Sequence, residues 1–313
     1  IMKKKPTIGI TIGDFNGIGP EVVAKSLQKK RILDLCTPVV IADSKVLDAL
    51  QCKINKKIEI YETSNRIQIN PGKPTLLSGR ASLNYVYEGI NLIKSKSIDC
   101  LVTAPISKYA IGKAGSKFKG HTDLLQESFK VKNVVMSFFS KNINISLSTI
   151  HIPIKDVATQ ISKSTILEQI VIINRSLKKY FGLKNPKIAI CAINPHASED
   201  GQIGDDDLRI TFPAVQLARQ KKILAYGPFP ADTLFIDENR TSYDIIHSIY
   251  HDQGLIPFKM LAFERGVNTT LNLPFIRTSP DHGTAYDIAW KDKANSKSME
   301  EAMLLAIKMY QKS

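Results

Sequence analysis

The sequence predicts an α/β protein of two joined subdomains. Strand-like apolar runs alternate with segments of helical periodicity, and no internal repeat or low-complexity linker interrupts them. The length of 313 residues allows one large or two modest α/β domains. We therefore expect one catalytic chain, residues 1–313, made of two interleaved subdomains whose boundary the sequence does not define.

The first expected elements form a strand–helix–strand series. Thr7–Ile12 alternates as a half-buried strand does, and Pro20–Lys30 begins with a proline, which the first turn of a helix tolerates. Val39–Ala42 and Lys57–Tyr61 have strand character, and Asn70–Pro74 is rich in turn residues.

The next two elements are a long helix and a buried strand. Ser78–Lys94 has helical periodicity, with Leu83, Tyr87 and Ile90 expected on its core-facing side. Ile98–Thr103 is a short apolar run, typical of a strand buried on both faces.

The remaining elements follow the same rules of periodicity. The expected strands are Asn133–Phe139 and Ile143–Ile150, which form a hairpin, then Lys187–Ile193, Ile245–Tyr250 and Val267–Leu273. The expected helices are His121–Lys130, Ser164–Phe181, Asp206–Lys222 and Ser298–Gln311.

Three histidines come directly after strand-like runs. In open α/β sheets, ligands gather beyond the carboxyl ends of the strands, and a catalytic divalent metal usually has three protein ligands and one open position. One such histidine alone is more often a half-buried residue bonded to a loop carbonyl. Three at equivalent positions favour a metal site made of His151, His196 and His251.

Composition and charge narrow the class of protein. The chain has 43 Lys and Arg against 29 Asp and Glu, a net charge of +14. The lysines are spread along the chain without a basic stripe interleaved with aromatics, so we expect no nucleic-acid partner; attraction of phosphorylated ligands is the alternative to a merely solvated surface. No apolar run could span a bilayer and the basic start, Lys3–Lys5, has no signal core behind it, so we expect no membrane partner. Four scattered cysteines fit the reducing cytoplasm.

Two motifs near opposite ends of the chain resemble motifs of one enzyme superfamily. Gly13–Glu21, with the pattern G-D-x-x-G-I-G-P-E, lies between a strand and a helix; alone it could be a tight turn. It resembles the opening motif of the isocitrate and isopropylmalate dehydrogenase superfamily, and Asp281–Asn295 resembles that superfamily's adenosine-binding loop. The resemblance implies an isocitrate/isopropylmalate dehydrogenase-like fold with a site in the cleft between its subdomains. It also implies NAD or NADP as cofactor, bound through His282, Asp287 and Asn295.

Further strings narrow the resemblance to one family. Lys119–Asp123, Tyr250–Lys259, Gly266–Asn268 and Arg277–Thr284, together with the three histidines, are similar to the 4-hydroxythreonine-4-phosphate dehydrogenases of pyridoxal phosphate biosynthesis. The similarity runs from about Pro6 to the C-terminal helix. It implies that the three histidines bind one divalent metal ion (zinc, magnesium or cobalt), and that a phosphorylated substrate is bound by His121, Thr122, Lys259, Asn268 and Arg277. One departure is Ala197–Gly201, which is less rich in glycine than the family's stretch.

The resemblance implies a homodimer with its site at the interface and metal ligands from both chains. Val134, Val135, Phe138 and Phe139 exceed simple alternation, so a partner could cover this hairpin; burial within its own domain is the alternative.

The implied reaction is NAD(P)-dependent oxidation of 4-phosphohydroxy-L-threonine to a β-keto acid, which decarboxylates to 3-amino-2-oxopropyl phosphate. Lys259, Asp232 and Asp252 are candidates for moving protons or orienting ligands, while His247 is interpreted as structural. The alternatives are a related dehydrogenase of another phosphorylated hydroxyacid or of a dihydrodiol and, more remotely, a metal-dependent hydrolase or a nucleic-acid-binding protein.

Overall fold

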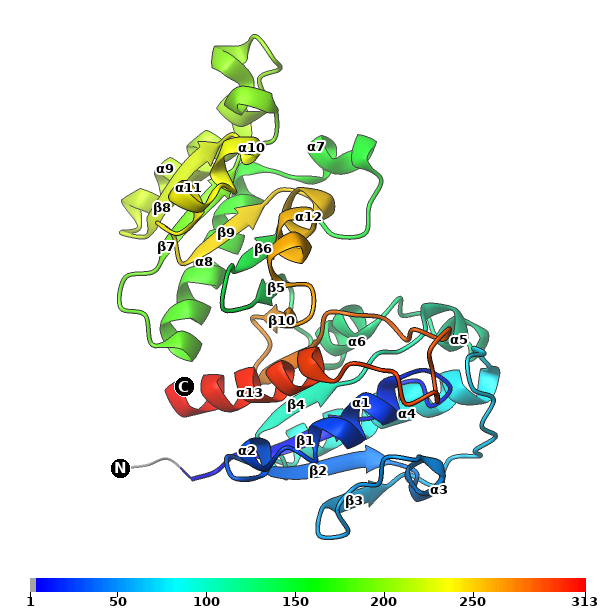
Figure 1. Cartoon of the computed structure of the whole chain (residues 1–313). Coiled ribbons are helices and arrows are strands. Elements are labelled where there is room, and N and C mark those ends of the chain that lie inside the picture. The colour runs from blue at the N-terminus through cyan, green and yellow to red at the C-terminus, as the bar shows by residue number, and fades with distance from the viewer. Residues whose placement is uncertain (1–3) are drawn as a thin grey trace. The chain divides into compact units, whose positions relative to one another are not determined.

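The computed structural model describes residues 4–313 (Figure 1), so Lys3 of the basic start lies outside the described residues. The chain divides into two compact units. Unit 1 comprises the described residues up to Lys132 and Leu273–Gln311; unit 2 comprises Asn133–Asn272 and the last two residues. The chain thus leaves unit 1, builds unit 2 and returns. Among the described residues, no helix combines the length and hydropathy needed to cross a membrane.

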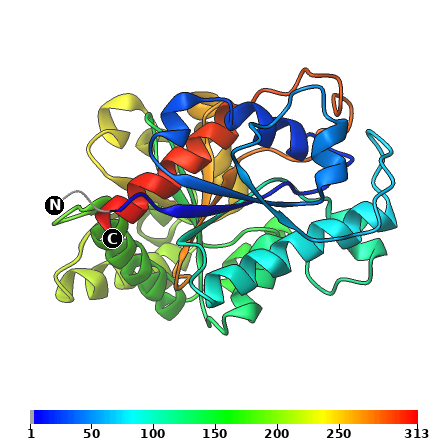
Figure 2. The same cartoon turned by 90° about the horizontal axis from the view of Figure 1, so that it is seen from below.

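Unit 1 is built on a parallel sheet with strand order β3-β2-β1-β4-β11. Helices α1 and α13 lie on one face of this sheet and α4 on the other (Figure 2). β1, β4 and β11 are buried almost throughout, as expected for parallel strands covered on both faces. The strands are β1 (Thr7–Thr11), β2 (Thr37–Ala42), β3 (Glu59–Glu62), β4 (Cys100–Thr103) and β11 (Ile276–Pro280); the helices are α1 (Gly19–Ser26), α2 (Lys30–Leu33), α3 (Ser44–Ala49), α4 (Leu76–Lys94), α5 (Lys108–Lys113), α6 (His121–Ser128) and α13 (Lys297–Lys312).

The first expected helix is shorter than its pattern indicated. α1 ends at Ser26, where the last turn tightens: the amide of Lys29 donates to the carbonyl of Ser26, three residues back. Lys29 is then extended, and a second helix begins at Lys30. The expected helix Pro20–Lys30 is therefore two helices joined by a break.

The expected core-facing side of α4 was wrong in part. Ile90 is buried, but Tyr87 is 42% exposed. The buried face contains small residues: a Cβ on Gly79 would lie 2.1 Å from the carbonyl oxygen of Ala110, and one on Gly89 would lie 2.8 Å from Leu101. The core face of α4 therefore combines small residues at its closest contacts with large side chains, of which Tyr85 and Val86 are fully buried.

Unit 2 has a mixed sheet with strand order β10-β5-β6-β9-β7-β8. β5 is antiparallel to both neighbours, whereas β6, β9, β7 and β8 run parallel. The strands are β5 (Val135–Phe139), β6 (Ile145–Leu147), β7 (Lys187–Cys191), β8 (Leu224–Phe229), β9 (Ile245–Ser248) and β10 (Val267–Leu271); the helices are η1 (Ile154–Asp156), α7 (Val157–Gln160), α8 (Lys163–Phe181), η2 (Pro195–Gly201), the π-helix η3 (Asp207–Thr211), α9 (Phe212–Gln220), α10 (Ala231–Leu234), α11 (Asp237–Arg240) and α12 (His251–Ala262).

The β5–β6 hairpin is confirmed, but its own unit covers it. Phe138 and Phe139 point to opposite faces of the sheet. Phe138 packs on Phe258 of α12 at 5.6 Å between ring centroids, and Phe139 stacks on Phe181 of α8 at 4.6 Å. The apolar excess of this hairpin is thus explained within unit 2, and it gives no support to a partner subunit.

Helix α12, which follows His251, was not expected from the sequence. Gly254 and Pro257 both disfavour a helix interior. Gly254 is needed for contact with the sheet, since a Cβ there would lie 2.8 Å from Ser248 Oγ and 2.9 Å from a methyl group of Leu147. Close packing on β6 and β9 therefore outweighs local helix propensity.

Candidate active site

The three candidate metal ligands follow three neighbouring parallel strands of unit 2. β6 leads to His151, β9 to His251 and β7 to His196, and the strand order is β6-β9-β7. All three strands therefore end at the same edge of the sheet. This confirms the strand-end placement that the sequence indicated.

His151 and His251 lie side by side. Their ring centroids are 5.7 Å apart, close to the spacing of neighbouring strands. His251 Nδ1 lies 2.6 Å from a carboxylate oxygen of Asp252. A carboxylate on Nδ1 holds the ring in one orientation and leaves Nε2 for a metal, so Asp252 can orient this ligand.

His196 lies in a backbone segment of unusual conformation. Residues 196–200 all have positive φ, between 41° and 69°, in the left-handed region that favours glycine. Asp207, which is buried, anchors the segment: its carboxylate accepts hydrogen bonds from the amides of Ile193 and Asn194 and from the Ser198 hydroxyl. The departure Ala197–Gly201 thus places non-glycine residues at strained positions that side-chain bonds hold in place.

A single copy of the described chain does not gather three such ligands at one point. Within residues 4–313, no group of three or more His, Cys, Asp or Glu side chains could hold a metal ion. His151 and His251 form a pair, and His196 does not join it. The assignment of His151, His196 and His251 to one metal ion therefore remains a prediction.

Two residues that sequence reasoning assigned no role in the site brace the strand ends. Gln253 accepts a hydrogen bond from the amide of Ile249 and donates one to the carbonyl of Ala192, linking the ends of β9 and β7. The sequence offered one signal for this role: Gln253 is the polar residue of the H-D-Q-G string and follows the end of β9 by about one helical turn.

His247 is fully buried within β9, as its structural interpretation required. Its ring nitrogens lie 2.9 Å from Ser146 Oγ and 3.1 Å from Gln169 Oε1.

The other candidates of unit 2 lie on separate elements. Lys259 is on α12 with its ammonium 5.7 Å from the Phe263 ring centroid, and Asn268 is half-buried in β10 opposite Phe138. Asp232 is exposed in the first turn of α10, a position where a carboxylate also stabilises the helix end. Lys259, Asn268 and Asp232 remain candidates, and their roles remain predictions.

Unit 1 brings together His121 and Arg277 of the expected substrate-binding set. Arg277 is 3% exposed and its guanidinium donates to Thr103 Oγ1 at 2.7 Å. Burial lowers the pKa of Arg277 to about 9, so it remains charged at neutral pH. Burial, followed by the charge of Arg277, holds the pKa of His121 well below 6.5. Thr122 is in the first turn of α6, where backbone amides attract anions. A buried cation beside a helix N-terminus can bind a phosphate or carboxylate.

The two motifs from opposite ends of the sequence meet in unit 1. The amide of Ile18 donates to the carbonyl of Thr284 at 2.9 Å, and Trp290 Nε1 donates to the carbonyl of Phe15. Asp14, fully buried, accepts hydrogen bonds from the hydroxyls of Ser78 and Tyr286. Burial raises the pKa of Asp14, and these hydrogen bonds oppose the rise. The segments Gly13–Glu21 and Asp281–Asn295 thus form one structure.

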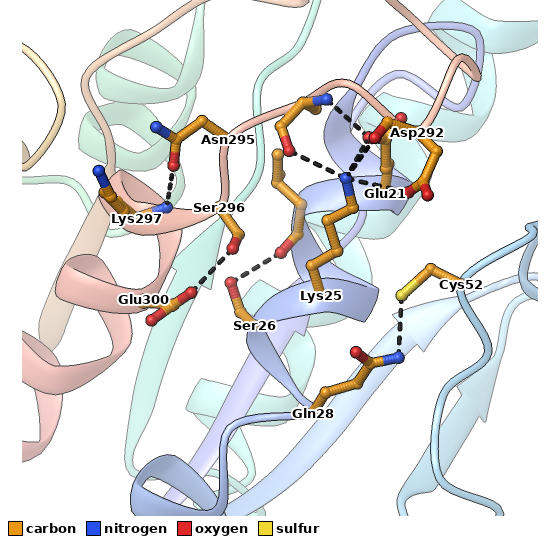
Figure 3. A network of polar contacts seen from close by, with 12 residues as sticks. Glu21, Lys25, Ser26, Gln28, Cys52, Asp292, Asn295, Ser296, Lys297 and Glu300 are labelled. Carbon is orange, nitrogen blue, oxygen red and sulfur yellow. Dashed lines mark hydrogen bonds and ion pairs between the residues drawn. The ribbon is translucent and has the colours of Figure 1, made fainter.

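The three cofactor candidates lie along that second segment, and Figure 3 shows one of them, Asn295. Asn295 Oδ1 accepts a hydrogen bond from the amide of Lys297 at the start of α13. His282 Nδ1 lies 3.1 Å from the carbonyl of Gly283, and Asp287 is exposed, its carbonyl accepting from Lys291 Nζ. Their role toward a dinucleotide remains a prediction.

The α/β fold is one that isocitrate dehydrogenase-like proteins share. A solved isocitrate dehydrogenase from Methylococcus capsulatus shares the fold, with a TM-score of 0.50 over 96% of this chain and 83% of that one at 12% identity. The profile of the family described as pyridoxal phosphate biosynthetic protein PdxA matches residues 34–306, and the chain belongs to that family.

Proteins similar to this chain include several dehydrogenases. The chain is 39% identical to a 4-hydroxythreonine-4-phosphate dehydrogenase from Desulforapulum autotrophicum, covering 96% of this chain and 95% of that one. It is 37% identical to a proposed D-threonate 4-phosphate dehydrogenase from Oceanobacillus iheyensis, covering 98% and 99%. A crystal structure of 4-hydroxythreonine-4-phosphate dehydrogenase from Klebsiella pneumoniae is 33% identical, with a TM-score of 0.87 and 98% of each chain covered.

Proposed function

We propose that this enzyme oxidises 4-phosphohydroxy-L-threonine with NAD or NADP and one divalent metal ion. The product is a β-keto acid, which loses carbon dioxide to give 3-amino-2-oxopropyl phosphate. The observation that carries the proposal is the delivery of His151, His251 and His196 by adjacent parallel strands in a chain of this family. Zinc, magnesium and cobalt are the candidate metals, and imidazole ligands favour zinc or cobalt over magnesium.

The donor set of unit 2 fits a catalytic metal. The three histidines would hold it as neutral ligands, and Asp252 would fix the His251 ring through Nδ1. A metal bound there would supply Lewis-acid polarisation of the substrate's secondary hydroxyl. Lys259, Asp232 and Asp252 are the candidates for the base that would take the hydroxyl proton, and a bound nicotinamide ring would supply the hydride acceptor.

We assign the phosphorylated substrate to the five candidates His121, Thr122, Lys259, Asn268 and Arg277. We assign anionic groups of the substrate to Arg277, with the amides at the start of α6 and the neutral His121 ring beside it. Lys259 and Asn268 are the matching candidates of unit 2. Because Arg277 is buried and charged, an anion that binds it also compensates a charge removed from water.

A second copy of the chain would complete the metal site. Large apolar side chains are exposed after each histidine: Ile154 follows His151, Leu208 and Phe212 follow His196, and α12 exposes Ile256 (59%), Met260 (82%) and Phe263 (71%). The last three are spaced i, i+4, i+7 and so lie on one helix face. An exposed apolar face beside an incomplete ligand set fits a homodimer interface.

Subunit mixing tests the dimer. Inactive His151→Ala and Lys259→Ala variants, mixed under conditions that exchange subunits, should regain one functional site per mixed dimer if the two residues serve one site from different chains. Repeating the experiment pairwise with His196→Ala and His251→Ala identifies which ligand the partner supplies. Met260→Asp should shift the sedimentation coefficient toward a monomer. If subunits exchange, no pair regains activity and Met260→Asp sediments as the wild type does, the interface proposal fails.

A substrate panel tests the reaction. Purified enzyme is assayed for NADH or NADPH absorbance with phosphohydroxythreonine and with D-threonate 4-phosphate, with and without added metal. Metal-dependent NADH or NADPH formation with phosphohydroxythreonine supports the proposal, and a clear preference for D-threonate 4-phosphate would instead favour the alternative dehydrogenase. Hydrolysis of the phosphate ester without reduction of the cofactor would indicate the metal-dependent hydrolase, and steeply salt-dependent binding of DNA or RNA the nucleic-acid-binding alternative.

We propose that the enzyme is located in the cytoplasm. The four cysteines are free, and three of them are buried. Free thiols of this kind are typical of proteins from reducing compartments.

A further inference from the structure

The Asp281–Asn295 segment, which the proposed function assigns to the dinucleotide, has a strained backbone. Ala285, Trp290 and Asp292 are non-glycine residues with φ values of 40°, 63° and 57°. Such a backbone conformation is unfavourable for a residue with a Cβ and persists only where surrounding contacts hold it. Helix α1 supplies a cluster of contacts to the end of this segment.

Lys25 of α1 is the centre of these contacts (Figure 3). Its ammonium lies 2.9 Å from the Asp292 carboxylate, 2.9 Å from the Asp292 carbonyl and 3.1 Å from the Ala294 carbonyl. It also pairs with Glu21, one helical turn earlier, at 2.9 Å. One cation thus joins a carboxylate of its own helix to three acceptors of the loop.

Glu21 completes the clamp from the same helix face. It is 4% exposed, and its Oε1 accepts a hydrogen bond from the amide of Ala294 at 2.7 Å. The N–H and the C=O of Ala294 are therefore both bound, one by Glu21 and the other by Lys25. The next residue is Asn295, whose side chain receives the amide of Lys297. Asn295 lies between a clamped peptide and a helix start, so its position depends on both.

We infer that Lys25 is a positioning residue for the dinucleotide: it holds the Asp292–Asn295 backbone in its binding conformation before the cofactor arrives. Lys25 itself does not touch the reacting atoms. The inference rests on the proposed cofactor role of Asn295. If the loop is ordered in only about a tenth of the molecules without Lys25, the apparent dissociation constant for the dinucleotide rises about tenfold.

The chain contains its own reporter for this loop. Trp290 is the single tryptophan of the sequence, and its indole donates to the carbonyl of Phe15 beside α1. Energy transfer from Trp290 to bound NADH measures binding directly, without turnover. The same titration therefore gives a dissociation constant that does not depend on the metal site or on substrate.

The test compares Lys25→Met with a matched control. Methionine keeps an apolar stem of similar length and removes the charge. The control is Arg31→Met, which removes a cation that pairs with Glu300 and does not contact the Asp292–Asn295 backbone. We expect the NADH dissociation constant and the dinucleotide KM to rise about tenfold in Lys25→Met, with kcat and the substrate KM within about twofold of wild type, and no change in Arg31→Met. Hydrogen exchange at residues 292–296 should become faster in Lys25→Met alone.

A milder variant keeps the test decisive if Lys25→Met fails to fold. Asp292→Asn removes one ion pair from an exposed partner and leaves the two carbonyl bonds, so a rise of about two- to threefold is expected. The inference is overturned if a folded Lys25→Met variant binds NADH with wild-type affinity while Asn295→Ala still weakens binding. If Lys25→Met does not fold, the same result in Asp292→Asn overturns it. If Trp290 emission does not respond to NADH and Asn295→Ala binds as the wild type does, the proposed cofactor role itself is wrong and the inference falls with it.

Discussion

Protonation of the buried His247 should make a measurable contribution to the acid sensitivity of the fold. His247 has no solvent exposure, and burial lowers its pKa from 6.5 to about 4. Between these values the unfolded chain binds a proton that the folded protein does not. The neutral ring therefore stabilises the fold fully above pH 6.5, and this stabilisation is lost as the pH falls toward 4.

The magnitude follows from the two pKa values. Between about pH 7.5 and about pH 5, proton binding to the unfolded state should lower the free energy of unfolding by about 2 kcal/mol through this one residue. His247→Gln keeps an amide that can bond Ser146 or Gln169 and removes the titration. The variant should be less stable near pH 7.5, by about 1–2 kcal/mol for a weakened hydrogen-bond pair, but should lose about 2 kcal/mol less than wild type on acidification.

Urea unfolding of the metal-free protein at both pH values measures this difference. His196→Gln is the control, because His196 is exposed and its ring is solvated in both the folded and unfolded states. An equal pH-dependent loss of stability in wild type and His247→Gln would refute the reasoning. A reduced loss in His196→Gln would show that the effect is not specific to the buried ring.

Three further predictions address the site. Asp252→Asn should weaken metal binding about 10- to 100-fold, because the His251 ring loses its orienting carboxylate; calorimetric titration of the metal measures this, and unchanged affinity would remove Asp252 from the site. Arg277→Met should raise the substrate KM about 10- to 100-fold with little change in the dinucleotide KM, since charge-assisted hydrogen bonds to an anion are lost; a wild-type substrate KM would contradict its role. Asn295→Ala, or His282→Ala, should raise the dinucleotide KM more than the substrate KM in initial-rate kinetics, and equal effects on both would count against a cofactor role.

The sequence predicted the helices and strands that have clear hydrophobic periodicity. It did not predict features that depend on close packing between elements. The strands that carry His151, His196 and His251 were found because apolar runs are long and end in polar residues. Helix α12 was missed because Gly254 and Pro257 suggest a break, although Gly254 is what allows contact with Leu147. The core face of α4 was misjudged because Gly89, and not Tyr87, packs against Leu101 of the sheet, while Gly79 packs against Ala110 of α5.

The candidate site was predicted in its parts but not in its connections. The two motifs around Asp14 and His282 are 268 positions apart, and only the fold shows that Tyr286 bonds Asp14. The link from Gln253 to Ala192 and the clamp of Lys25 on Ala294 depend on distances that no local pattern encodes. The hairpin at Phe138 does not support a partner subunit, because helices of its own unit cover it, which was the alternative interpretation of its apolar excess.

The metal requirement of oxidation is the central claim, and metal titration of the chelated enzyme tests it most directly. Enzyme freed of metal is supplied with phosphohydroxythreonine and NAD or NADP, and zinc, cobalt or magnesium is added stepwise while cofactor reduction is followed. We predict no turnover without metal, full activity at one metal ion per chain, and neither metal binding nor recovery in a folded His196→Ala variant. Wild-type turnover by the metal-free enzyme, or full recovery in His196→Ala, would contradict the assignment of the three strand-end histidines to a catalytic metal.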